Sequence, residues 1–276
     1  MIMRIGRWFR HMSGDEKTFQ QISAPDELVE YIQAKEKEYM DKLLDAFTRR
    51  SVDIQSWFDS ANLVKATWTG KMKIDPRNEL ESWGQVAENV FVGAIHILFP
   101  SWIPIGLPIG SETRLETADA IIHIDLKTHR EGDSDLDRTQ DVRPEQISGC
   151  GDISNLFPSL LPSENTFVED SQGRLGEGPP KLPPYYDFGQ GRIKLCITMF
   201  IICAYDADLS NNERRLSRFQ LFCVPNGIAR HLRDYRDIFQ VGKNGRDLHR
   251  YRVNLVDLAR HEGWRWSEVR ATKSIK

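Results

Sequence analysis

The sequence predicts an α/β protein in which helices flank a central mixed β-sheet, with a long helical N-terminal part. Apolar residues recur at helical spacing through the first 100 residues, and runs rich in Ile and other strand-forming residues follow them. Helices that cover a short sheet form one layered α/β unit. We therefore expect a single domain over residues 1–276, with a mainly helical part (1–100) and a core (101–276).

Each helix has its own signals in the sequence. The first is predicted over residues 23–50, because Pro25 stands in its first turn and Asp26 and Glu27 lie at the positive end of its dipole. Closely spaced Pro and Gly residues make 102–109 extended or looped. Further helices are predicted over residues 52–64, 78–99, 228–240 and 256–261.

Four later runs are rich in strand-forming residues, and we assign all of them to the sheet. They are Ala120–Leu126, Ile193–Tyr205, Phe219–Val224 and Tyr251–Leu255. Among them lies Gly149–Gly191, a stretch rich in Pro, Gly and Ser. A structureless stretch of this length inside a compact domain is usually functional, so we expect a long surface excursion there.

Composition excludes several classes of protein. The longest apolar run, Leu195–Ala204, is too short to cross a bilayer, so no membrane partner is expected. Met1–Arg10 is basic but leads into polar residues instead of an apolar signal core, which predicts a cytoplasmic protein. The four cysteines lack CxxC spacing and are expected to be buried thiols. Gly173–Gly178 lacks the lysine of a phosphate loop, so no nucleotide cofactor is expected.

Charge is distributed unevenly along the chain. From Gln190 to Lys276 there are 17 Lys and Arg against 9 Asp and Glu, a net +8, whereas the remainder carries −11. A basic surface joined to an acidic remainder suits a protein that holds a polyanion and keeps carboxylates for a metal. Uneven solvation is the alternative explanation, and charge alone does not decide between them.

The residues that bear chemistry lie in one segment, 112–127. On a strand the side chains alternate between faces, so Asp125 and Lys127 project to one face about 7 Å apart. A turn at Glu116–Asp119 would fold the segment into a hairpin that places Glu112 opposite Lys127 and close to Asp125. Two acids and a lysine are therefore expected to converge.

This combination predicts metal-dependent phosphodiester hydrolysis with Mg²⁺ as cofactor. Two carboxylates with room for water are the hard oxygen ligands that Mg²⁺ prefers. A lysine beside them can orient an attacking hydroxide and stabilise charge on the phosphate. The same acid-x-lysine spacing at Asp15–Lys17 lacks a preceding strand-like run. A solvated ion pair between Asp125 and Lys127 is the alternative that spacing leaves open.

Six segments then occur in an order that is familiar from one nuclease family. They are Gly106–Glu112, Ile124–Lys127, Gly132–Asp135, Pro144–Asp152, Val224–Gly227 and Arg250–Leu255. In these segments, and over most of the chain from about Glu81, the sequence resembles the PD-(D/E)xK nucleases and, within them, the type II restriction endonucleases of the BglI family. The resemblance implies a restriction-endonuclease-like core. The first 80 residues show little of it.

Carried over by position, the resemblance implies that Glu112 and Asp125 bind the divalent metal and that Lys127 acts beside the nucleophilic water. Glu88, on the third predicted helix, matches a further acid near the family's site. The family usually has Asp where this chain has Glu112, and the stretch from there to Asp125 is shorter here. Asp119 is the competing first acid, but a hairpin would leave it at the turn, roughly 20 Å from Asp125. We prefer Glu112.

The resemblance also implies base reading by Asp133, Lys243, Arg250 and Arg252. Arg and Lys donate to O6 and N7 of guanine, and Asp accepts from N4 of cytosine, so a G·C-containing site would follow. Arg250 and Arg252 alternate to one side of a short predicted strand and can reach one groove. Without the resemblance, a phosphate-binding or solvated basic strand would be the favoured interpretation.

Taken together, these features predict a type II restriction endonuclease that cuts both strands of double-stranded DNA at a short palindrome, continuous or interrupted. A homodimer is expected, because a two-fold protein can place one site on each strand. The alternatives are a structure-specific or repair nuclease and a catalytically inactive, sequence-specific DNA-binding protein. A metabolic enzyme has only the acidic pair in its favour.

Overall fold

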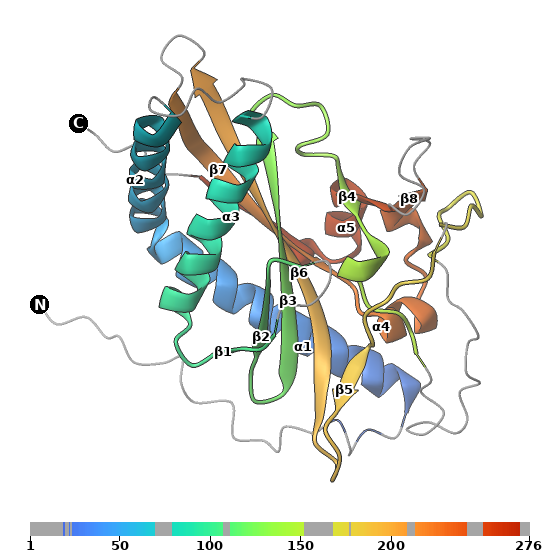
Figure 1. Cartoon of the computed structure of the whole chain (residues 1–276). Helices are drawn as coiled ribbons and strands as arrows, with labels where there is room; N and C mark the ends of the chain where they lie inside the picture. Colours follow the sequence, from blue (N-terminus) through green and yellow to red (C-terminus); the bar gives the residue numbers. More distant parts are fainter. Residues whose placement is uncertain are drawn as a thin grey trace, which may run out of the picture.

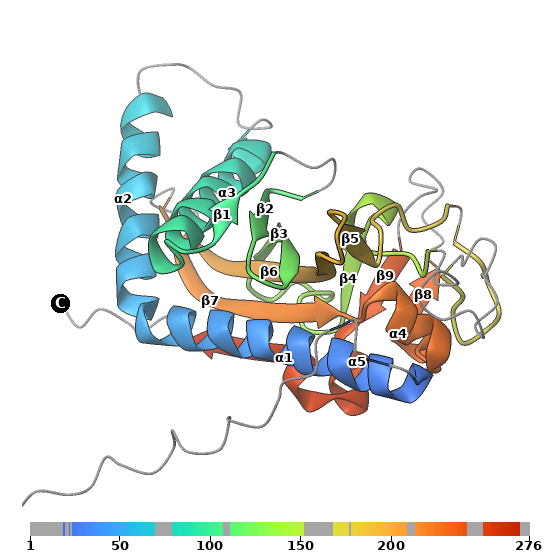
Figure 2. The ribbon, with the colours of Figure 1, turned by 90° about the horizontal axis from the view of Figure 1, so that it is seen from below.

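The structure is a computed structural model that describes residues 19, 22, 24–69, 79–106, 111–151, 168–176, 178–208, 213–241 and 251–270. Helices α1 (Pro25–Arg49), α2 (Ser51–Thr69) and α3 (Glu79–Leu98) confirm the helical N-terminal part. Helix α1 starts without a side-chain cap, but Pro25 stands at its first position and two acids occupy its first turn. In Figure 2, α1 lies along the sheet and α2 stands at the opposite end from α4.

The large sheet is mixed, as predicted. Among the described residues it contains seven strands in the order β1-β2-β3-β6-β7-β10, with β5 also paired to β6. Strands β3 and β6 run parallel, and the other pairs are antiparallel. The strands are β1 (Ile103–Pro104), β2 (Thr113–Glu116), β3 (Ala120–Arg130), β5 (Tyr185–Asp187), β6 (Ile193–Asp208), β7 (Glu213–Val224) and β10 (Trp266–Arg270).

The pleat of the central strands separates two hydrophobic cores. On β3, Ile122 and Ile124 face the core that contains the helices α1 and α3. On β6, Phe200 and Ile202 face a second core on the other side of the sheet. Asp125 has the opposite parity to Ile124 and therefore turns away from the helices, toward the side of Phe200.

A second, small sheet covers this other side. It consists of β4 (Thr139–Val142), β9 (Tyr251–Asn254) and β8 (Phe239–Val241), in the order β4-β9-β8. Figure 1 shows β4 and β8 with α4 and α5 at the right of the molecule, away from α2. Because Tyr251–Asn254 pairs with β4 and β8, the prediction that it belongs to the main sheet was wrong.

Two further expectations need correction. The predicted helix over 228–240 is only α4 (Gly227–Leu232), because the chain then makes a 3₁₀ turn and enters β8 with Phe239 buried in the second core. The predicted surface excursion, where it is described, contains β5 on the main sheet. Helix α5 (Leu255–His261) matches its prediction.

Two further observations concern the cysteines and the helices. All four cysteines are described, buried and free of disulfide bonds. In the described part of the chain, no helix combines the length and apolar character that a membrane span requires.

A buried ion pair joins the two ends of the described chain. Glu36 of α1 and Arg265 are both fully buried, and their side chains approach to 2.7 Å. Glu36 also accepts a hydrogen bond from the backbone nitrogen of Asn226 at 2.7 Å. Burial raises the pKa of Glu36, and the charge of Arg265 opposes that rise. The pair thus fixes α1 against the end of β7 and the start of β10.

We predict that Glu36→Ala lowers the free energy of unfolding by about 3–5 kcal/mol, because it leaves Arg265 buried without its main partner. Urea denaturation followed by circular dichroism measures this change. The control is Lys37→Ala, because the ion pair of Lys37 with Asp41 lies on the exposed face of the same helix. This variant should lower the free energy of unfolding by less than about 1 kcal/mol. Equal losses in the two variants would refute the role of the buried pair.

Candidate active site

The β2–β3 hairpin sets the position of the first acid. Thr113 pairs with Ile124 and Glu116 with Ile121. The backbone nitrogen of Glu112 donates to the Ile124 carbonyl at 3.1 Å. The next position in this register lies opposite Asp125, so the prediction that Glu112 lies opposite Lys127 was wrong by two residues.

The turn explains the difference in register. Its four residues are 117–120, closed by a 2.9 Å hydrogen bond from the Thr117 nitrogen to the Ala120 carbonyl, instead of the predicted 116–119. The Thr117 hydroxyl also accepts a hydrogen bond from the Ala120 nitrogen at 3.0 Å. A shift of two residues keeps every side chain on the same face of the sheet, so Glu112 still lies beside Asp125.

The Glu112 carboxylate occupies the place that a longer β2 would fill. Its Oε2 accepts a hydrogen bond from the backbone nitrogen of Leu126 at 2.8 Å. That nitrogen faces the β2 edge beyond the last strand pair, where it would otherwise lack a backbone partner. The side chain is thereby held against β3 beside Asp125.

Asp125 and Lys127 form the centre of the site. Asp125 is almost completely buried, and its Oδ2 lies 2.6 Å from Nζ of Lys127. Its Oδ1 accepts a hydrogen bond from Nε2 of Gln146 at 2.7 Å. The Lys127 side chain is about one-fifth exposed, and its ammonium lies 5.8 Å from the ring centroid of Phe200. The solvated-pair alternative does not describe this geometry.

The acids influence one another strongly. Burial, together with a hydrogen bond and the charge of Asp125, raises the pKa of Glu112 to about 8. Burial and the charge of Asp125 also raise the pKa of Glu88, while Lys127 lowers it. Glu88 on α3 is therefore close enough to act electrostatically on the same cluster. Like charges held this close in a low dielectric need a shared proton or a cation.

This donor set is compatible with a divalent cation. Two neighbouring carboxylates, buried at Asp125 and half-buried at Glu112, offer hard oxygen ligands, and metal binding can take the place of a proton between them. Within the described ranges, no three His, Cys, Asp or Glu side chains gather as a ready metal site. A cation at Glu112 and Asp125 would thus need water or substrate oxygens to complete its coordination, as Mg²⁺ commonly does.

The competing acid has a different role. Asp119 lies in the hairpin turn, where its Oδ2 forms an ion pair with Lys35 of α1 at 2.8 Å and its Oδ1 accepts a hydrogen bond from Tyr39. The charge and hydrogen bonds from these partners lower the pKa of Asp119 despite burial. Asp119 therefore fastens the hairpin to α1, which supports Glu112 as the first acid.

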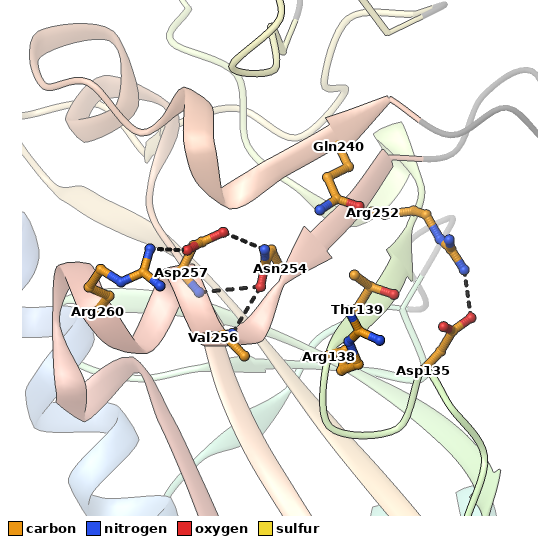
Figure 3. Close-up of a pocket in the computed structure, with 9 residues that line it drawn as sticks. All are labelled: Asp135, Arg138, Thr139, Gln240, Arg252, Asn254, Val256, Asp257 and Arg260. Carbon is orange, nitrogen blue, oxygen red and sulfur yellow. Dashed lines mark hydrogen bonds and ion pairs between the residues drawn. The ribbon is translucent and has the colours of Figure 1, made fainter.

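A groove formed by two adjoining pockets leads from Lys127 to the small sheet. A pocket of about 240 Å³ is lined by Lys127, His129, Asp141 and Arg252, among others. A second pocket of about 490 Å³ shares Asp135, Thr139 and Arg252 with the first. Figure 3 shows Arg252 reaching toward Asp135, with Arg138 and Thr139 beside them.

Arg252 is held in a fixed orientation in this groove. Its Nη2 donates to Asp135 at 2.7 Å and its Nε to Asp141 at 3.1 Å. These bonds leave Nη1 without a hydrogen-bond partner among the described residues. The side chain is about one-third exposed, so the free end of the guanidinium can reach a ligand in the groove.

Of the other three predicted base-reading residues, the structure describes only Asp133. Asp133 is exposed and accepts a hydrogen bond from the Arg130 nitrogen at 2.9 Å, which closes a turn. Asp133 is not part of the lining of the two pockets that contain Arg252. Lys243 and Arg250 lie outside the described residues.

Three contributors were not singled out from the sequence. Gln146 contacts Asp125, and Asp135 and Asp141 orient Arg252. Gln146 and Asp135 do occur in segments that carry the family resemblance, so those segments held a signal. Nothing in the sequence pattern links Asp141 to Arg252, because the two are joined only by β4–β9 pairing.

The fold is that of a restriction endonuclease. The crystal structure of restriction endonuclease BglI bound to its DNA recognition sequence matches with a TM-score of 0.70 and 22% identity, covering 90% of this chain and 95% of that one. The tetrameric restriction endonuclease SfiI bound to cognate DNA matches with a TM-score of 0.64 and 14% identity, covering 94% and 90%.

The sequence identifies the family within this class. The family model described as restriction endonuclease BglI matches residues 19–269. The chain therefore belongs to the BglI family of restriction endonucleases. No curated protein sequence matches it.

The acid pair predicts a pH-dependent stability in metal-free protein. Folding raises the pKa of Glu112 from 4.5 to about 8, so the folded state favours the protonated carboxyl. This preference adds to the free energy of unfolding in full below pH 4.5, and the added stability is lost as the pH rises through 8. In EDTA, Glu112→Gln should therefore melt at a higher temperature than the wild type at pH 8.5, with a smaller difference at pH 5.5. Differential scanning calorimetry at both values measures this. An equal difference at both pH values would contradict the assignment.

Proposed function

We propose that this chain is a Mg²⁺-dependent type II restriction endonuclease that hydrolyses both strands of double-stranded DNA at a short, G·C-containing palindrome. The active unit is a homodimer, and each chain forms one domain in which residues 101–276 carry catalysis and base reading. The observation that carries the proposal is the convergence of Glu112, Asp125 and Lys127 at the end of a groove that contains Arg252.

Glu112 and Asp125 are the residues that would hold the metal, and Glu88 would add negative charge beside them. When bound, Mg²⁺ polarises the scissile phosphate and lowers the pKa of a water molecule. The interior-facing position of Asp125 excludes bulk water from one side of the site, which strengthens these electrostatic effects. The raised pKa of Glu112 fits a site whose acids are prepared for a cation.

Lys127 supplies the positive charge of the protein itself. It stands beside Asp125 and borders the smaller pocket, so its ammonium can reach a phosphate in the groove. In that position it orients the attacking hydroxide and stabilises the charge that develops on the phosphate. The bond broken is a P–O bond of the backbone, and water supplies the new oxygen and the proton of the leaving group.

Base reading is assigned to Arg252, with Asp133, Lys243 and Arg250 as further candidates. The two carboxylates that hold Arg252 reduce the entropy lost when it binds a base edge. Its Nη1, which has no hydrogen-bond partner among the described residues, and the remaining proton of Nη2 match the O6 and N7 acceptors of guanine. BglI and SfiI, two structural relatives, are both solved bound to DNA that they recognise.

Digestion of a DNA of known sequence tests the function. We expect discrete fragments in Mg²⁺ and none in EDTA, and sequencing of the fragment ends gives the recognition site and the stagger. A smear or junction-dependent cutting would favour a structure-specific nuclease. Sequence-specific binding without cleavage in Mg²⁺ or Mn²⁺ would indicate an inactive DNA-binding protein. Size-exclusion chromatography with light scattering distinguishes a dimer from the tetrameric state of SfiI.

Lys127→Ala should lower the cleavage rate by about 10²–10³-fold or more, because it removes a charge from the transition state. The affinity for an intact duplex that contains the recognition sequence, measured in Ca²⁺ by fluorescence anisotropy, should stay near that of the wild type. Lys42→Ala, which removes an exposed lysine paired with Glu38 on α1, is the control. Cleavage at the wild-type rate in Lys127→Ala would remove Lys127 from the site.

Arg252→Ala should cost about 1–3 kcal/mol of discrimination at one base pair of the recognition site. The measurement is the binding free energy for the cognate duplex and for each single-base-pair variant. Arg270→Ala removes a highly exposed arginine outside the groove and is the matched control. A uniform loss of affinity for all duplexes would make Arg252 a phosphate contact instead.

A further inference from the structure

One glutamine amide contacts both members of the Asp125–Lys127 pair. Gln146 ends a 3₁₀ turn over Pro144–Gln146, and its side chain is almost fully buried. Nε2 donates to Oδ1 of Asp125 at 2.7 Å, and Oε1 accepts from Nζ of Lys127 at 3.4 Å. A carboxamide is suited to this position because it presents a donor and an acceptor at once.

The backbone determines which way this amide points. The Arg143 nitrogen donates to Oε1 of Gln146 at 2.8 Å. Since a backbone N–H can only donate, the amide oxygen must face Arg143 and Lys127, and the amide nitrogen must face Asp125. Arg143 is extended, as expected for a residue before proline, which holds its N–H in this orientation.

The hydrogen bond also restricts the carboxylate. A carboxylate can rotate about its terminal bond, and a bond to one oxygen limits that rotation. With Oδ1 bonded to Gln146, Oδ2 is the oxygen directed at Lys127. The acid and the lysine are therefore held in one relative arrangement by a residue from a different segment of the chain.

We propose that Gln146 is a positioning residue, which orients the Asp125 carboxylate and the Lys127 ammonium for divalent-cation binding and phosphodiester cleavage. The inference rests on the proposed function. Residues that orient metal ligands through hydrogen bonds typically change metal affinity or activity by about 10–100-fold when they are replaced. Gln146 acts through Asp125 and Lys127, so its replacement affects cation binding as well as turnover.

The test compares Gln146→Leu with Gln220→Leu. Gln220 is fully buried and donates a hydrogen bond to an aspartate, Asp137, outside the site. It is therefore a matched control for the loss of a buried amide. Calorimetric titration of the full-length protein with Mn²⁺ and single-turnover cleavage across a range of Mg²⁺ concentrations are the two readouts.

We expect Gln146→Leu to bind Mn²⁺ about 10–100-fold more weakly and to need correspondingly more Mg²⁺ for half-maximal cleavage. Gln220→Leu should match the wild type in both measurements. Gln146→Met keeps the length of the side chain but removes the amide that donates to Asp125, so it should lose Mn²⁺ affinity in the same direction even if the leucine variant fails to fold.

Wild-type Mn²⁺ affinity in Gln146→Leu or Gln146→Met would overturn the inference, as would equal losses in Gln146→Leu and Gln220→Leu. The two claims fail differently. A wild-type protein that binds Mn²⁺ but does not cleave DNA would refute the proposed function, and the Mn²⁺ titrations would still decide the role of Gln146. Absence of Mn²⁺ binding in the wild type would refute both.

Discussion

The arrangement of the candidate site depends on the hydrogen bond from the Leu126 backbone to the Glu112 carboxylate. Strand β3 lies between β2 and β6, and it continues beyond the point where β2 ends. The first unpaired N–H on that edge belongs to Leu126, and an acid one residue before β2 is within reach of it. The same geometry that satisfies a backbone donor thus brings a second carboxylate beside Asp125.

The surroundings explain why this acidic cluster can form at all. Asp125 is buried next to Phe200 on the neighbouring strand, which belongs to the second core. A charge in such a place is costly unless it is paired, and Lys127 and Gln146 provide partners from two sides. The site therefore lies where the second core meets the groove, with one side shielded by hydrocarbon and the other open to a ligand.

The sequence predicted those features that depend on residues close together in the chain. Strand alternation placed Asp125 and Lys127 on one face, and helix signals located α1–α3 closely. The hairpin register was missed by two residues, because the Thr117 hydroxyl and the closing hydrogen bond select a different turn. Gln146 and Asp141 reach their partners only through pairing of distant segments, which one sequence does not reveal. Gly227, in the Val224–Gly227 segment, is a further case in which a distant part of the chain decides the residue. A Cβ there would lie 1.9 Å from the Gly149 carbonyl oxygen, so this contact requires glycine.

We propose that Glu112 and Asp125 together bind a divalent cation beside Lys127. The most direct test of this proposal is the position of Mn²⁺, located by anomalous scattering in crystals of the protein with its cognate duplex. We expect a manganese ion in contact with the carboxylates of both Glu112 and Asp125. A manganese ion bound at Asp119, or one that contacts neither carboxylate of the pair, would contradict it.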